Sequence, residues 1–399
     1  MPKVDIVNKD IVVVGLVAFN ASYGNNCENI AIEFAKKNRV LFVNPPLDRN
    51  SIYKNIDAVV LAQKQDVLKG KTTDLKEVSK NLWVYTPKTI LESINWLPVP
   101  FIHTIFNKIN NKRYAGQIKS AIERLGFKNF MLFNDNDIFR SFYLKDYLKP
   151  EKYIYYIRDN LTVMDYWKRH GQRLEPKLFA KSDVIVANST YLANYAKKYN
   201  NNSFYVGQGC DFTLFKSDVV RNEPEDMKNI PFPRVGYVGN LTSVRLDISL
   251  LVYLAKSKPE WSIVLIGPED DLFKKSDLHK YSNVYFLGSK KMDVISDYVS
   301  HFDVCINPQV INPVTIGNYP RKIDEYLALG KPVVATKTMA METFQEHTYL
   351  AESFEDYIVL IKKALDENNE NKKLGRINFA SQHTWENNVK EIYNSISHI

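Results

Sequence analysis

Residues 318–336, NYPRKIDEYLALGKPVVAT, combine residue types that suit the binding of an anion. Pro320 suits the start of a helix, and Gly330 can adopt the left-handed conformation that ends one. The free amides and the positive dipole end of such a helix attract phosphate groups, so the segment suits a diphosphate. Lys322 and Glu325 share one helix face, where the lysine can neutralise a phosphate and the glutamate can accept hydrogen bonds from sugar hydroxyls. The alternative is an ordinary exposed ion pair on a helix surface.

A second segment with binding chemistry is GNLTSVRLD, residues 239–247, which follows an apolar strand pattern. A glycine at the end of a strand lets a ligand approach the backbone at the carboxyl edge of a parallel sheet. Arg245 can then reach a phosphate oxygen with the fork geometry of its guanidinium group. A plain strand–turn–helix with an exposed arginine is the alternative.

The elements that would position these residues follow a regular alternation of apolar runs and amphipathic stretches. Apolar strands separated by helices are typical of a parallel sheet covered by helices on both faces. We predict strands at 11–17, 40–44, 129–134, 152–158, 183–188, 234–239, 261–267, 284–288, 303–307 and 331–336. We predict helices at 27–38, 110–125, 189–199, 247–257, 291–300, 320–329, 353–366 and 384–396.

The alternation breaks at 217–233, which is charged, aperiodic and contains prolines. Such composition is typical of a linker, so the sequence predicts an α/β fold of two doubly wound domains in tandem. We expect a first domain at 1–205, a linker at 206–233 and a second domain at 234–382.

Composition narrows the class of protein. The chain has 399 residues, 45% hydrophobic and 25% charged, with three widely separated cysteines. We therefore expect neither a disulfide framework nor a structural zinc site, and a cytoplasmic location without a signal peptide or spanning helix. Residues 1–200 carry 31 basic and 19 acidic side chains, whereas the remainder carries 22 and 26. This asymmetry favours an anionic partner for the first half, unless it reflects only a generally lysine-rich composition.

Several segments together resemble one family. GNLTSVR resembles the G-R-L-x-x-x-K segment of GT-B glycosyltransferases, in particular the family 4 group (glycosyl transferases group 1) and its teichuronic-acid and capsular polysaccharide relatives. PRKIDEYLALGKPVVAT is similar to that family's donor-site helix. AKSDVIVANSTYLANYAKKY, VGQGCDFTLF and TWENNVKEIY are similar to its strand–serine–helix segment, its link between domains and its final helix. The resemblance covers most of 150–396 in the expected order.

The resemblance implies a fold and a donor site. It implies two Rossmann-like domains that face a cleft, with a C-terminal helix at 383–399 that crosses back to the first domain. Arg245 and Lys322 would contact the diphosphate of a nucleotide-sugar, and Glu325 would hold the ribose. The full set of expected donor-binding residues is Gly239, Asn240, Arg245, Pro268, Ser289, Gly317, Asn318, Tyr319, Arg321, Lys322 and Glu325.

Two positions depart from the family pattern. Asn240 stands where the family usually has an arginine, which removes one phosphate contact. Gly317 stands eight residues before Glu325, where many members carry a glutamate that addresses the donor sugar. Sugar recognition would then fall to the backbone amides of 317–319.

The expected chemistry needs neither a cofactor nor a metal ion. Charge develops on the leaving diphosphate, and arginine, lysine and helix amides can stabilise it. No convincing DxD-like pair is present, which agrees with a metal-free site. In a retaining enzyme the leaving phosphate can accept the proton of the acceptor, whereas an inverting enzyme needs a carboxylate or histidine. Asp159 and its neighbour Arg158 are the catalytic candidates, although a structural role for Asp159 is an equal alternative.

Two segments bear on the acceptor. The loop at 19–26 follows the first strand, and Ser22, Tyr23 and Asn25 are candidate acceptor contacts. Residues 94–113 mix aromatic and basic side chains, which suits a seat on an anionic membrane surface. The alternative for 94–113 is a helix packed on the domain core.

The sequence therefore predicts a glycosyltransferase that moves a sugar from a UDP or GDP donor to a lipid-linked or growing saccharide in surface polysaccharide synthesis. It would work at the inner face of the membrane, by retention and without a metal. The scattered basic residues argue against nucleic acid as a partner. Two alternatives stay open: a GT-B type nucleotide-sugar epimerase and a non-catalytic membrane-surface adaptor derived from a transferase.

Overall fold

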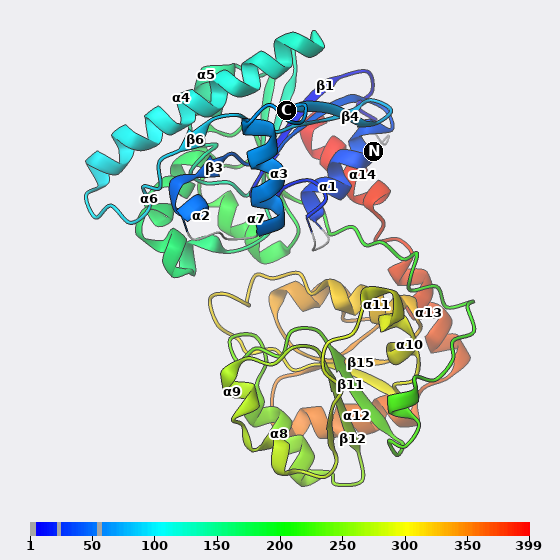
Figure 1. Ribbon diagram of the computed structural model, residues 1–399. Coiled ribbons are helices and arrows are strands. Elements are labelled where there is room, and N and C mark those ends of the chain that lie inside the picture. The colour runs from blue at the N-terminus through cyan, green and yellow to red at the C-terminus, as the bar shows by residue number, and fades with distance from the viewer. Residues whose placement is uncertain (1–4, 22–24, 54–57) are drawn as a thin grey trace. The chain divides into compact units, whose positions relative to one another are not determined.

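The computed structural model describes residues 5–21, 25–53 and 58–399. These form two compact units, one of residues 1–207 with 385–399 and one of residues 208–384 (Figure 1). Each unit contains a mainly or wholly parallel sheet with helices against it, so the predicted α/β architecture is confirmed.

The first unit is built on an eight-stranded sheet in the order β10-β9-β8-β7-β1-β2-β5-β4. All pairs are parallel except β4 with β5, which is antiparallel. Its central strands are buried, except for the first residue of β8, because both faces of the sheet are covered. The strands are β1 (Asp10–Gly15), β2 (Arg39–Val43), β4 (Leu75–Ser79), β5 (Leu82–Tyr85), β7 (Met131–Asp135), β8 (Lys152–Ile157), β9 (Val184–Ala187) and β10 (Ser203–Tyr205), with β3 (Leu47–Asp48) and β6 (Ile90–Leu91) paired separately.

Two apolar layers sandwich this sheet. Leu178 and Leu192 lie in one layer, and Ile30 and Ile392 lie in the other. The helices of this unit are α1 (Asn26–Ala35), α2 (Arg49–Tyr53), α3 (Ala58–Leu68), α4 (Pro100–Leu125), α5 (Leu144–Leu148), α6 (Asp165–Lys181), α7 (Thr190–Lys197) and α14 (Trp385–Ser397), with a 3-10 turn at Leu161–Val163.

The last helix, α14, follows the second unit in the chain but belongs to the first unit (Figure 1). The Phe34 ring of α1 stacks on the Tyr393 ring, with centroids 5.5 Å apart. Asn38 donates a hydrogen bond to the Tyr393 hydroxyl at 2.9 Å, and Asn388 donates one to the Val206 carbonyl at 2.9 Å. The expected return of the final helix to the first domain is confirmed.

The second unit has a parallel six-stranded sheet in the order β13-β12-β11-β14-β15-β16. Its strands are β11 (Arg234–Val238), β12 (Ser262–Ile266), β13 (Val284–Phe286), β14 (Val304–Asn307), β15 (Val333–Thr336) and β16 (Tyr349–Ala351). Its helices are α8 (Ile248–Ser257), α9 (Asp271–Lys274), α10 (Ile295–Ser300), α11 (Arg321–Ala328), α12 (Phe354–Asp366) and α13 (Glu370–Ala380), with 3-10 turns at Glu225–Met227, Asp277–Lys280, Met292–Val294 and Met339–Phe344.

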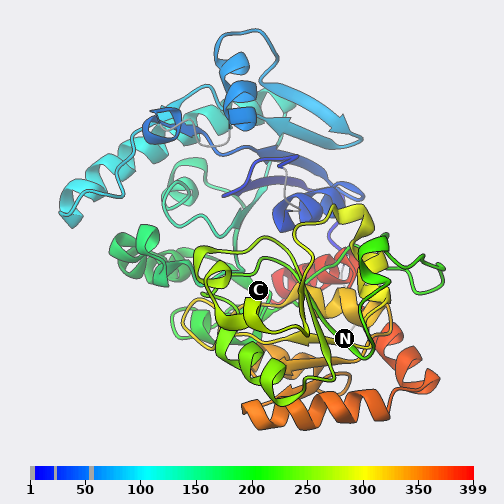
Figure 2. The same cartoon turned by 60° about the horizontal axis from the view of Figure 1, so that its bottom comes forward.

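In each sheet the direction of strand addition reverses at one place. β1 lies between β2 and β7, and β11 lies between β12 and β14. In open α/β sheets, ligands bind outside the carboxyl ends of the strands at such a switch point. We therefore look for functional side chains at these two places, one in each unit. Figure 2 shows the strands and helices of the units from a second direction.

Three features differ from the sequence expectation or were not foreseen. α4 begins at Pro100, ten residues before the predicted 110, and the antiparallel β4 was not anticipated. The segment expected as a linker, 206–233, contributes Phe215, Met227 and Ile230 to the core of the second unit. Among the described residues no helix is long and apolar enough to cross a membrane.

Candidate functional site

The carboxyl edge of the second sheet is lined by bare backbone. Gly239 and Gly267 follow β11 and β12 with φ values of +142° and +145°, a region that side chains disfavour. A Cβ atom on Gly267 would lie 1.9 Å from the carbonyl oxygen of Gly239, so only glycine fits there. The Gly239 amide donates to Ile266 at 2.9 Å, and the Gly267 amide donates to Gly288 at 3.0 Å. The two glycines therefore let the backbone at the end of β12 and the Lys322 ammonium group lie close against Gly239.

Lys322 reaches this edge from α11. A Cβ atom on Gly239 would lie 2.7 Å from the Lys322 Nζ, which places the ammonium group beside the end of β11. The same Nζ lies 3.8 Å from the centroid of the Tyr237 ring and contacts the Tyr237 hydroxyl. Burial lowers the pKa of Lys322 to about 7; the Glu325 carboxylate opposes this shift and the charge of Arg245 adds to it. Lys322 thus lies beside Gly239 and is close enough to Arg245 and Glu325 for their charges to affect its pKa.

The position of α11 follows from its sequence. Ile323, Tyr326 and Leu327 form its buried face, and the Tyr326 hydroxyl accepts a hydrogen bond from the Val238 amide at 2.9 Å. Gly330, at φ +72°, ends the helix in the predicted left-handed conformation. The helix is therefore fixed to the end of β11, which holds Lys322 at the switch point.

Glu325 makes a different ion pair from the one considered in the sequence. It pairs with Arg321, one turn earlier, at 3.3 Å. Burial raises the pKa of Glu325, although the charges of Arg321 and Lys322 oppose that shift. Its expected role toward a ribose stays a prediction.

In the loop before α11, one amide that we expected to bind the donor sugar already forms a hydrogen bond within the protein. The Asn318 amide donates to the Thr315 carbonyl at 3.0 Å, so the expectation that it binds the sugar conflicts with this turn. Contacts of Gly317 and Tyr319 with a donor stay predictions. Three further candidates, Asn240, Pro268 and Ser289, are exposed near the glycine-lined edge or on neighbouring loops, and their roles also stay predictions.

The sequence analysis missed a buried carboxylate beside Glu325. Asp324 is fully buried and accepts hydrogen bonds from the Tyr319 hydroxyl at 2.7 Å and the Cys210 thiol at 3.4 Å. It also lies 2.5 Å from His383 Nδ1. The Cys210 amide donates to the His383 carbonyl at 2.8 Å, so Asp324 ties the two ends of the second unit's chain to α11. The sequence analysis did not single out Asp324, because no local pattern marks it as buried.

In the first unit, the catalytic candidates Arg158 and Asp159 lie at the carboxyl end of β8. Arg158 pairs with Asp159 at 3.0 Å and with Asp135 at 2.9 Å. Asp135, the last residue of β7, is fully buried. Burial raises the pKa of Asp135, and the Arg158 charge opposes that shift. The candidate pair is thus part of a charged triad at the switch point. The sequence analysis did not single out Asp135. With Asp137 it forms a D-x-D pair at the end of β7, so the expectation that no such pair has a convincing strand context is wrong.

The candidate acceptor contacts are only partly described. Ser22 and Tyr23 lie outside the described residues. Asn25 is buried and caps α1, because its Oδ1 accepts a hydrogen bond from the Cys27 amide at 3.0 Å. That interaction accounts for Asn25 structurally and leaves its role toward an acceptor a prediction.

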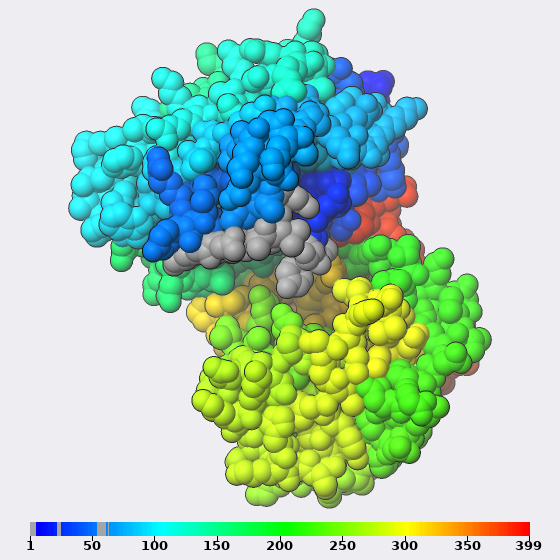
Figure 3. Space-filling model, in the orientation of Figure 1, coloured from blue at the N-terminus to red at the C-terminus, as the bar shows by residue number. Residues whose placement is uncertain are grey.

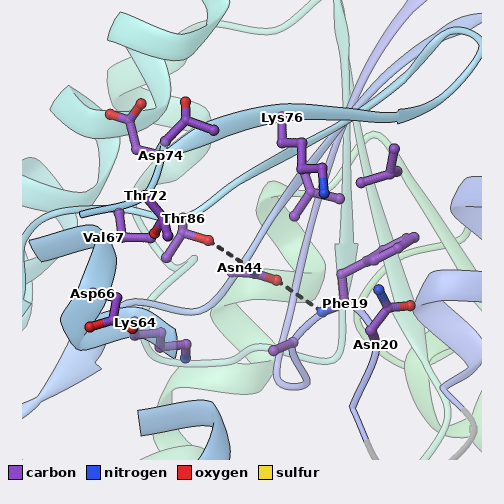
Figure 4. A pocket seen from close by; sticks show the side chains of 14 residues that line it. Phe19, Asn20, Asn44, Lys64, Asp66, Val67, Thr72, Asp74, Lys76 and Thr86 are labelled. Carbon is purple, nitrogen blue, oxygen red and sulfur yellow. Dashed lines mark hydrogen bonds between the residues drawn. The ribbon is translucent and has the colours of Figure 1, made fainter. Parts of the chain in front are cut away.

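A pocket of about 590 Å³ opens in the first unit beside the carboxyl ends of β2 and β5 (Figure 4). Asn44 lies at its centre, accepting from the Phe19 amide and donating to the Thr86 hydroxyl, each at 2.9 Å. Lys64, Asp66 and Lys76 also line it. A pocket of this size, with a lining of polar and apolar groups and an aromatic ring at its edge, suits a saccharide. No sequence motif pointed to it, because its residues come from five separate segments.

The sequence is similar to those of known glycosyltransferases. Residues 232–367 match the family model of glycosyl transferases group 1. The chain is 25% identical over 242 residues to the putative teichuronic acid biosynthesis glycosyltransferase TuaH of Bacillus subtilis strain 168. That match covers 57% of this chain and 60% of TuaH.

Solved structures resemble nearly the whole chain. Sucrose-phosphate synthase from Thermosynechococcus elongatus has a TM-score of 0.63 at 15% identity, with 98% of this chain and 99% of that chain covered. Anabaena HepE, solved in complex with UDP, has a TM-score of 0.64 at 14% identity, with 98% and 100% covered. The fold is therefore the GT-B fold. The resemblance to glycosyl transferases group 1 is confirmed, with the family match lying over the second unit.

Proposed function

We propose that this protein is a glycosyltransferase that takes its sugar from a nucleoside diphosphate donor bound by the second unit. The observation that carries the proposal is the position of Lys322 Nζ beside Gly239, at the switch point of the sheet. The family match over 232–367 supports it. The HepE structure is a complex with UDP, which supports a nucleotide ligand for this fold.

The residues at this edge fit the chemistry of glycosyl transfer. The bond between the anomeric carbon and the diphosphate oxygen breaks, and the electron pair stays on the diphosphate. Lys322 and Arg245 then stabilise the growing negative charge, so the site needs no metal ion. A new bond forms between the acceptor oxygen and the anomeric carbon, and the acceptor proton passes to the leaving phosphate in a reaction with retention.

The acceptor is proposed to be a saccharide held by the first unit, lipid-linked or part of a growing polysaccharide. The pocket around Asn44 and Phe19 has the size and the mixed lining for such a ligand. The teichuronic acid relative supports a role in surface polysaccharide synthesis. A location at the inner face of the cell membrane is part of this proposal.

The proposal is tested by product analysis. The purified protein would be incubated with sugar-labelled UDP-glucose, UDP-galactose, UDP-N-acetylglucosamine and GDP-mannose, each with solubilised polyprenyl-diphosphate saccharides. We expect one donor to release nucleoside diphosphate while label enters the lipid fraction, and Lys322→Met to abolish both. A donor whose sugar changes configuration without release of diphosphate would identify the epimerase alternative. No turnover of any donor by folded protein would favour the adaptor.

A further inference from the structure

The N-terminal half of α4 exposes its apolar face. Phe101 is 73% exposed, and the loop before the helix holds Trp96, which is 69% exposed. The exposed apolar residues recur at the spacing of one helix face, and they are Phe101, Ile102, Ile105, Phe106 and Ile109. We call these five residues, together with Trp96 and Val99, the α4 apolar face. α4 lies along the outside of the first unit (Figures 1 and 3).

The opposite face of the same turns is polar, yet it is the one that is buried. Asn110 donates to the Glu92 carbonyl at 2.9 Å and accepts from the Glu92 amide at 3.0 Å. Asn111 donates to the Phe139 carbonyl at 2.9 Å and accepts from the Tyr143 amide at 2.9 Å. Buried amides with satisfied hydrogen bonds are costly to disturb, so these contacts fix which side of the helix faces inward.

The first turn of α4 and the segment before it are held as well. His103 is buried and stacks on His170 of α6, with ring centroids 3.7 Å apart. His170 Nε2 lies 2.8 Å from the Leu97 carbonyl, and Arg169 donates to the Trp96 carbonyl at 2.5 Å. Rotating α4 to bury its apolar face would break all of these contacts. The α4 apolar face therefore points outward in the folded unit and needs a partner outside it.

The charged side chains of residues 94–113 are all basic. Residues 94–113 contain no acidic side chain, and Lys108, Lys112 and Arg113 follow the apolar turns. Arg113 pairs with Glu92 at 3.3 Å, whereas neither lysine forms an ion pair with a described residue. Apolar side chains next to lysines match a bilayer, where the first enter the acyl boundary and the second meet anionic headgroups.

We propose that the α4 apolar face docks the first unit on an anionic lipid bilayer. The proposal deepens the proposed function, because it gives the surface that would bring the enzyme to a lipid-linked acceptor. It rests on the geometry of the first unit alone, whereas donor binding belongs to the second. The two proposals can therefore fail independently.

Vesicle sedimentation of the full chain tests it. We expect binding to vesicles of phosphatidylcholine with 30% phosphatidylglycerol and at least tenfold weaker binding to phosphatidylcholine alone. Phe101→Ser with Phe106→Ser should weaken binding to the anionic vesicles at least tenfold. Lys108→Glu with Lys112→Glu should remove the preference for anionic lipid. The matched control, Val359→Ser with Leu374→Ser, changes two exposed apolar residues of the second unit and should leave binding unchanged.

Two further measurements, of UDP binding and of the oligomeric state, serve as controls for this test. UDP binding by each variant should equal that of the unchanged protein, because all four α4 substitutions lie in the first unit, so failed docking is distinct from failed donor binding. No sedimentation with anionic vesicles would overturn the proposal. It would also be overturned if light scattering showed a dimer that Phe101→Ser with Phe106→Ser made monomeric, since a second copy would then cover the face.

Discussion

The ammonium nitrogen of Lys322 lies 3.8 Å from the centroid of the Tyr237 ring, beside the backbone of Gly239. A lysine enclosed in this way loses hydration, and its pKa falls to about 7. The face of the Tyr237 ring and the nearby Glu325 carboxylate stabilise the ammonium charge less than water would. A bound diphosphate would provide the missing stabilisation of this charge. Lys322 is therefore the residue on which the proposed donor site most depends.

The first prediction concerns the pH dependence of nucleotide affinity. Free Lys322 loses its proton as pH rises through about 7, whereas a bound diphosphate would hold the proton on. We expect the dissociation constant of UDP to rise by roughly tenfold or more between pH 6.5 and 8.5. Calorimetry on the unchanged protein and on Lys322→Met separates this effect from the titration of UDP itself. Parallel pH profiles for the two proteins would contradict the prediction.

A second prediction follows for stability. The pKa of Lys322 is about 7 in the folded protein and near 10.5 when unfolded, so the unfolded chain binds more protons between these values. The stability of the unchanged protein should therefore rise with pH across this window. Lys322→Met should stabilise the second unit at pH 7 by at least about 1 kcal/mol, with a smaller gain near pH 10. Urea unfolding at both pH values measures this, and an equal effect at both would refute it.

The third prediction compares alanine substitutions at Gly267 and Gly288. Gly267→Ala would place a Cβ atom 1.9 Å from the Gly239 carbonyl oxygen, so the ends of β11 and β12 must move apart. We expect a loss of about 2–4 kcal/mol in unfolding free energy and a loss of nucleotide binding. Gly288→Ala meets open space and costs only the strain of its φ of +66°, about 1–2 kcal/mol. Equal effects of the two substitutions would show that the close approach of the strands is unimportant.

A fourth prediction concerns the first unit. Glu175 is buried against the hydroxyl groups of Tyr195 and Tyr155, and burial raises its pKa to about 8. The folded state therefore holds the proton between about pH 4.5 and 8, where the unfolded state releases it, so this residue destabilises the protein as pH rises. Glu175→Gln should gain stability over the unchanged protein by roughly 1.4 kcal/mol per pH unit in that window. Denaturant unfolding at pH 5, 6.5 and 8 checks it, and a constant difference would contradict it.

The sequence was informative where a residue's role depends on its own segment. The apolar strands, the glycine that ends α11 and the arrangement of Lys322 and Glu325 on one helix all follow from local patterns. Lys322 reached the expected edge because Tyr326, on the buried face of the same helix, is held by the end of β11.

The role of a residue could not be predicted from the sequence where it depends on contacts between distant segments. Asp324 is indistinguishable from a surface charge until Cys210 and His383 are brought against it. Tyr237 looked like one more strand residue, and the pocket around Asn44 is assembled from separate loops. The start of α4 was missed because its buried face is polar and its exposed face apolar, which inverts the usual amphipathic pattern.

The most direct test of the proposed donor site is calorimetric titration with UDP, GDP, ADP and dTDP. We expect one of them to bind in the micromolar range, about −8 kcal/mol, with affinity reduced at least tenfold by Lys322→Ala with Glu325→Ala. The matched control, Asp277→Ala with Lys280→Ala, removes an exposed pair three residues apart elsewhere in the second unit and should not alter affinity. No binding of any of the four nucleotides by folded protein, or an equal loss in the control, would contradict a donor site at Gly239 and Lys322.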